Sequence, residues 1–149
     1  MIDKQLPATA KLDFSGTWNL NTVLSAFSPA PAPSAQTEII TQIRDDFTVD
    51  FASTGDDGKQ RYLYTLKLGG PETPLKPILN ETSLVLISAK GEWRGNSIVV
   101  DAKISYQGYD GSLTSTYNLS PDGKTLIKTI AANTDFGDFD LKAVYDKAM

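Results

Sequence analysis

Cysteine and histidine are both absent from the 149-residue sequence. Disulfides and thiolate nucleophiles require cysteine, and Ser-His-Asp triads require histidine, so this chain can form none of them. Zinc sites built from these two residue types and His-ligated haem are excluded for the same reason. Carboxylates and tyrosines are left as the groups that could do chemistry. The sequence predicts neither a metal site nor a cofactor.

Positive charge is also scarce. Lys and Arg number 14 against 18 Asp and Glu, which gives a net charge of −4 and an isoelectric point near 4.7. Phosphate backbones and anionic membranes both select basic patches, and the basic residues here are scattered singly. Apolar runs such as 84–87 and 98–100 are far shorter than the ~18 residues of a membrane-spanning helix. We therefore expect no nucleic-acid partner and no membrane span.

Strand signals, by contrast, recur along the whole chain. Short runs of β-branched and aromatic residues alternate with clusters of Gly, Pro, Asn and Asp, and no long helical period interrupts them. This pattern predicts about nine strands. The predicted strands cover residues 14–20, 36–43, 46–54, 61–68, 83–94, 97–107, 112–119, 125–132 and 138–146. Tight turns such as Gly95-Asn96 and 121–124 join most of them, which indicates an antiparallel meander.

Two connections are longer and rich in proline, at residues 21–35 and 69–80. Proline favours extended backbone and cannot donate an amide hydrogen bond, so both segments are predicted to cross the surface as semi-rigid straps. A plain linker is one interpretation. A lid across one end of a barrel is the other, since loops on a rigid scaffold often carry binding functions.

Alternation of side chains along the predicted strands indicates a curved, closed sheet. Phe47, Val49 and Phe51 alternate with polar residues, and a similar apolar face runs along residues 98–106. The sequence thus predicts a polar tail at 1–13 and one all-β domain at 14–149. We expect that domain to be a monomeric, antiparallel up-and-down β-barrel of roughly eight to ten strands.

The inward face predicted for residues 112–119 mixes hydroxyl groups with apolar side chains. A solid core prefers aliphatic groups, whereas a ligand cavity is mostly apolar with a few polar groups that orient the ligand. The candidate cavity residues are Tyr64, Leu86, Tyr106 and Tyr117. The alternative is that each tyrosine spans the barrel wall and places its hydroxyl in water.

Glu92 is the carboxylate most relevant to a catalytic hypothesis. Both faces of residues 83–94 begin apolar. If the face of Leu84 and Leu86 is interior, Glu92 projects into the barrel mouth and could accept a proton or orient a polar head group. If the face of Trp93 is interior, Glu92 belongs to a solvated outer stripe, and the cost of exposing a tryptophan favours this second arrangement.

Near the start of the chain, residues 14–20 read FSGTWNL, with Gly16 and Trp18 two positions apart. This motif resembles the Gly-x-Trp signature of the lipocalin and calycin barrels. The resemblance implies that Trp18 packs across the closed end of the barrel, with segment 21–35 over the other end and a basic side chain from a late strand over the indole. Of the two lysines on the last two strands, Lys128 and Lys142, we predict that Lys142 takes this place.

A wider likeness spans roughly residues 13–147. Besides the motif above, it includes WRGN at 93–96, LSPDGKTL at 119–126 and VYDK at 144–147. In order and spacing the chain is similar to bacterial lipocalin-like proteins that are usually exported and to which no reaction is assigned. This implies a secreted or periplasmic protein, although the sequence begins on a polar tail without a leader, so a cytoplasmic location stays open.

The leading functional hypothesis is binding or carriage of a small hydrophobic or amphipathic molecule inside the barrel. Two alternatives remain open at this stage. One is a calycin-like enzyme that uses carboxylate and tyrosine acid-base chemistry, and the other is a barrel filled by its own side chains that acts through its surface. The sequence favours a binding protein over an enzyme, because the available carboxylates lie mostly on outward-facing positions.

Overall fold

The structure is a computed structural model that describes residues 12–28, 32–135 and 137–148. Residues 1–11 of the predicted polar tail therefore lie outside the described part of the chain. The strands are β1 (Gly16–Leu20), β2 (Ala35–Ile43), β3 (Asp46–Gly55), β4 (Gly58–Lys67), β5 (Thr73–Pro74), β6 (Pro77–Asn80), β7 (Leu84–Arg94), β8 (Ser97–Tyr106), β9 (Tyr109–Leu119), β10 (Thr125–Thr134) and β11 (Gly137–Lys147).

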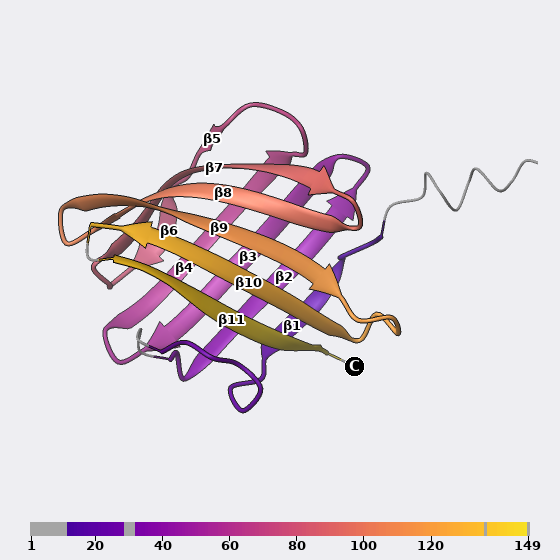
Figure 1. Cartoon of the computed structure of the whole chain (residues 1–149), viewed down its shortest axis with the longest axis horizontal. Helices are drawn as coiled ribbons and strands as arrows, with labels where there is room; N and C mark the ends of the chain where they lie inside the picture. The colour runs from indigo at the N-terminus through magenta and orange to yellow at the C-terminus, as the bar shows by residue number, and fades with distance from the viewer. Residues whose placement is uncertain (1–11, 29–31, 136, 149) are drawn as a thin grey trace, which may run out of the picture.

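All eleven strands belong to one antiparallel sheet, in the order β5-β7-β8-β9-β10-β11-β1-β2-β3-β4-β6. Most neighbours in the sheet are also neighbours in sequence, because tight turns join them. The one long-range closure pairs β1 with β11, where Trp18 lies opposite Lys147. The sheet curls so that β2–β4 and β8–β11 form two layers that cross obliquely (Figure 1). The prediction of an all-β antiparallel barrel is confirmed, as a half-barrel whose two sheet edges do not pair with each other.

The extra strands arise from the proline-rich segment that was predicted as a strap. After β4 the chain crosses to the opposite edge, where β5 pairs with β7, and then returns, where β6 pairs with β4. Prolines sit in both short strands, which suits edge positions because an edge strand needs only one side of its backbone paired. The segment 68–80 thus connects the two edges of the sheet. A hydrogen bond also links β7 to β4, because Leu86 N–H donates to the Tyr62 hydroxyl at 3.0 Å.

A β-bulge in β7 explains why the sequence indicated two inward faces for this strand. The register with β8 shifts between Leu86 and Ser88, which leaves Ile87 without an opposing residue. Because side chains alternate with period two, one extra residue switches the inward face. Leu84 and Leu86 point inward before the bulge, and Ala89 and Gly91 point inward after it. Each of the two arrangements inferred from sequence is correct for one half of the strand.

Trp18 closes one end of the barrel. Its side chain is fully buried in the core, and its indole N–H donates to the Phe14 carbonyl at 2.9 Å. Phe14 in turn contacts the ring of Trp93, with 6.0 Å between centroids. This matches the place that the Gly-x-Trp resemblance implied for Trp18.

The cation over the indole is Lys147, not Lys142. The Lys147 Nζ lies 5.6 Å from the centre of the Trp18 ring, because these residues are opposite each other in the β1–β11 register. Lys142 instead lies near the middle of β11, opposite Thr129 and Ala26. Gly16 makes room for this contact. A Cβ at that position would come within 2.9 Å of Lys147 Cε, and its φ of +150° is rare for residues with side chains.

We expect Trp18→Ala to lower the free energy of unfolding by about 3–5 kcal/mol, because it removes a large, fully buried aromatic group and leaves a cavity. Chemical denaturation of both proteins measures the difference. Lys147→Met serves as a matched comparison that removes the charge but keeps an aliphatic stem, and it should cost much less. A loss below about 1 kcal/mol for Trp18→Ala would contradict the role of the indole as a buried plug.

Candidate functional site

Between the two layers of the sheet lies a cavity of about 560 Å³. Its walls are mostly apolar and come from strands on both sides of the barrel. All four residues singled out from the sequence contribute to its lining, namely Tyr64, Leu86, Tyr106 and Tyr117. Tyr106 lies at the rim with 38% of its surface exposed, whereas Tyr117 is deeply buried at 1%. Whether these side chains contact a ligand stays a prediction.

The mouth of the cavity is opposite the Trp18 end. The turn between β3 and β4 lines it, as do the ends of β8 and β10, so several hairpins open toward the same side. Phe27 and Pro33, at either end of the proline-rich connection between β1 and β2, also contribute to the lining. These residues of segment 21–35 therefore border the cavity, whereas Asn21 and Ala26 bond the backbone of β11. Asp56 and Asp57 give the rim a negative character.

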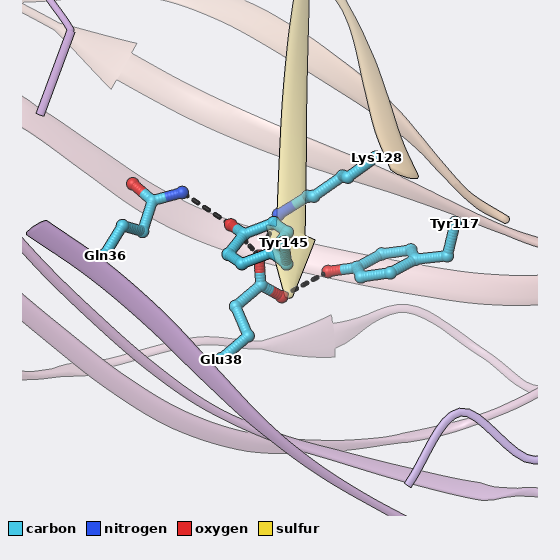
Figure 2. Close-up of polar contacts among 5 residues, drawn as sticks. All are labelled: Gln36, Glu38, Tyr117, Lys128 and Tyr145. Atoms are coloured by element: carbon cyan, nitrogen blue, oxygen red, sulfur yellow. Dashed lines mark hydrogen bonds and ion pairs between the residues drawn. The ribbon is translucent and has the colours of Figure 1, made fainter. Parts of the chain in front are cut away.

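At the inner end of the cavity, three polar side chains donate hydrogen bonds to the carboxylate of Glu38, which is completely buried. Its Oε1 accepts from the Tyr117 hydroxyl at 2.8 Å, and its Oε2 accepts from Lys128 Nζ at 2.9 Å and from the Tyr145 hydroxyl at 2.6 Å. Gln36 donates to the Tyr145 hydroxyl at 2.6 Å. Figure 2 shows Tyr117, Lys128 and Tyr145 converging on the carboxylate from three strands, with Gln36 bonded to the Tyr145 hydroxyl. We call Gln36, Glu38, Tyr117, Lys128 and Tyr145 the Glu38 cluster.

The cluster forms part of the cavity floor. Gln36, Tyr117 and Lys128 line the cavity directly, whereas Glu38 and Tyr145 lie behind them, toward Trp18. The β1–β2 register places Glu38 opposite Trp18, so Glu38 lies near the closed end of the barrel. The ammonium of Lys128 also lies over two aromatic rings, with Nζ 5.1 Å from the Tyr117 centroid and 5.7 Å from that of Phe51.

Glu38 was not predicted from the sequence. It belongs to β2, where Ile39 and Ile40 are adjacent and give no clear alternation, so a buried carboxylate could not be recognised by periodicity. The structure buries Ile40 and Glu38 on one face and leaves Ile39 43% exposed on the other. Lys128 was recognised only as a possible partner of Trp18. The signal that could have located the pair is a charged residue at an inward position on each of two strands.

Burial keeps three tyrosines of this region in their protonated form. Desolvation and the nearby charge of Glu38 raise the pKa of Tyr64 well above its usual value of about 10. The same two causes raise the pKa of Tyr117 and of Tyr145 well above the usual value. Hydrogen bonding to Tyr117 partly opposes the shift at Tyr64. These phenols therefore act as hydrogen-bond donors and as weakly polar walls rather than as bases near neutral pH.

Glu92, the carboxylate considered for catalysis, lies on the outer face of β7. It pairs with Arg94 at 2.9 Å, and the hydrogen bond and charge of Arg94 lower the pKa of Glu92. Three further strand carboxylates also face outward: Asp50 pairs with Arg61 at 2.9 Å, and Asp138 and Asp140 are exposed. Within the described residues, no group of three or more acidic side chains is arranged to hold a metal ion.

The described part of the chain also contains no helix with the length and apolar character needed to cross a membrane. Strand order, cavity and closed end together define an antiparallel half-barrel with an internal cavity. No family model matches the sequence, and no curated protein matches it.

Among solved structures, the fold is similar to that of zebrafish ileal bile acid-binding protein, crystallised in complex with cholic acid. The TM-score is 0.55 at 16% sequence identity, and the match covers 91% of this chain and 98% of the zebrafish protein. The likeness extends over nearly the whole of both chains and shows that the two proteins share the antiparallel half-barrel fold.

The raised tyrosine pKa values predict a loss of stability in alkali. Above about pH 10 the unfolded chain releases phenolic protons that the folded protein retains, so unfolding becomes more favourable as pH rises. As pH rises, we expect the tyrosinate absorbance of the folded protein to stay below that of the unfolded chain. It should then rise sharply at the pH where the protein unfolds. Tyr117→Phe should reduce that sharp rise. A smooth titration of all tyrosines without unfolding would contradict the buried positions of these three hydroxyls.

Glu38→Ala should lower the free energy of unfolding by about 3–5 kcal/mol, because it leaves Lys128 buried without its partner. Glu38→Ala/Lys128→Met should recover part of this loss, since the unpaired charge is removed as well. The outward-facing Glu92→Ala is the control and should change stability little. Denaturant melts at pH 7 measure all three, and equal losses for Glu38→Ala and the double variant would contradict the ion pair.

Proposed function

We propose that this protein binds or carries a small hydrophobic or amphipathic molecule inside its half-barrel. The observation that carries the proposal is the internal cavity of about 560 Å³, which lies within the usual range of roughly 300–1,000 Å³ for ligand sites. A barrel filled by its own side chains would lack such a space. Apolar walls with a few polar groups at one end are the arrangement expected for an amphipathic ligand.

The structural neighbour supports this proposal. The zebrafish protein is a bile acid-binding protein of the same architecture, and its structure contains cholic acid. Burial of apolar ligand surface contributes roughly 25 cal/mol per Å², so a cavity of this kind can supply useful affinity without any charged contact. A carrier needs no catalytic group, which agrees with the outward position of Glu92.

The bacterial, lipocalin-like subtype, export to a secreted or periplasmic location and the monomeric state are part of the same proposal. The sequence resemblance described above supports the subtype and export. Fractionation of the native host and light scattering of the purified protein test location and oligomeric state respectively.

Organic extraction of the purified protein followed by mass spectrometry tests ligand binding directly. A stoichiometric apolar molecule, absent from a mock purification, is the expected result. The protein should also be incubated with a mixture of fatty alcohols, fatty acids and isoprenoids and then extracted again. An empty extract in both cases would contradict the carrier function.

Ala102→Phe should block the cavity, because Ala102 lines it and a benzyl group would occupy its space. We expect at least a tenfold loss of affinity for Nile red, an uncharged apolar probe whose fluorescence rises in apolar surroundings. Ala131→Phe is the matched control, since Ala131 is exposed on the outer face of β10. Equal binding by the two variants would show that the probe binds outside the cavity.

A further inference from the structure

The charges at the cavity floor cancel each other. Among the described residues, Lys128 is the one cationic side chain that lines the cavity, and it is paired with Glu38 at 2.9 Å. The pair is almost completely enclosed, with 11% of the Lys128 side chain and none of the Glu38 side chain exposed. An incoming anionic head group would therefore find a cation that is already neutralised by a buried carboxylate.

Hydrogen-bond donors at the floor are likewise directed to Glu38. The hydroxyls of Tyr117 and Tyr145 both donate to it, so together with Lys128 three donors are used by one carboxylate. These donors would otherwise suit a ligand carboxylate. What the cavity offers a ligand there is a mixture of further N–H donors on Lys128 and the hydroxyl of Tyr64, which can both donate and accept.

We propose that the ligand of this cavity is an uncharged amphiphile whose hydroxyl head group reaches the Glu38 cluster, and that the cavity discriminates against carboxylates. This inference rests on the proposed function, whose site it specifies. A hydroxyl both donates and accepts, which matches the mixed floor. A carboxylate would place a second buried negative charge beside Glu38 after passing Asp56 and Asp57 at the rim, and a buried charge needs a partner of its own.

Three amphiphiles with the same alkyl chain test the head-group preference: dodecan-1-ol, dodecanoate and dodecylammonium. Each is titrated into the full-length protein with bound Nile red at pH 7.5, the two ions below their micellar concentrations and the alcohol below its solubility limit. We expect dodecan-1-ol to displace the probe with at least tenfold higher affinity than dodecanoate. Dodecylammonium should also bind more weakly than the alcohol, because Lys128 already occupies the place of a cation.

Glu38→Gln should reverse the discrimination. It removes the negative charge and leaves Lys128 available, so dodecanoate affinity should rise at least tenfold while dodecan-1-ol affinity changes less than about threefold, a tenfold change corresponding to about 1.4 kcal/mol. Glu92→Gln changes the net charge of the protein equally but lies on the outer face, and it should leave both affinities unchanged. The wild-type comparison stands on its own if Glu38→Gln does not fold.

The outcomes separate this inference from the proposed function. Failure of the probe and all three amphiphiles to bind would overturn carriage itself. A second outcome is that dodecanoate or dodecylammonium binds as tightly as dodecan-1-ol or more tightly, and that Ala102→Phe abolishes the displacement. This result would leave carriage standing but would overturn the preference for an uncharged head group. A parallel rise in dodecanoate affinity in Glu92→Gln would also overturn it, since the effect would then come from overall charge.

Discussion

A buried carboxylate is stable only if its surroundings supply donors and a compensating charge, and the interior of this protein is arranged around that requirement at Glu38. The groups that satisfy Glu38 come from β9, β10 and β11, at sequence separations of 79, 90 and 107 residues. They join the first large hairpin to the last strands of the chain. The cluster can form only when the sheet has curled and β1 has paired with β11, so it couples the two layers of the half-barrel.

The Glu38 cluster also divides the interior into two parts. On one side the core is dense, with Trp18 and Phe47 closing the end of the barrel. On the other side is the cavity, which opens toward the hairpin turns and the proline-rich segment. Because Tyr117 belongs to both parts, packing against Phe47 with 5.4 Å between ring centroids and bonding Glu38 through its hydroxyl, the floor of the cavity is held by the core.

Similarity to the zebrafish bile acid-binding protein concerns the architecture. The polarity of the interior depends on the inward-facing side chains of this chain. An antiparallel half-barrel creates inward positions in regular rows, and different side chains at those positions can give the same shape different polarity. Here one acid and one base sit together at the inner end, which gives a polar floor without net charge. The bulge at Ile87 similarly adapts the wall locally while the rest of the sheet stays regular.

Strand propensity, turn residues and side-chain alternation were enough to predict the all-β antiparallel sheet and residues such as Tyr64 and Tyr117 on the inner surface, because these depend on local patterns of period two. The place of Trp18 followed from the Gly-x-Trp resemblance. The pairing of Glu38 with Lys128 could not be predicted, because the two residues are 90 positions apart and their contact depends on closure of the sheet. The same holds for Lys147 over Trp18, which follows from the β1–β11 register, and for the bulge in β7, which makes both faces of one strand interior. Local pattern of period two determined the inward face of the regular strands, whereas tertiary register decided which inward side chains meet and where a bulge switches that face.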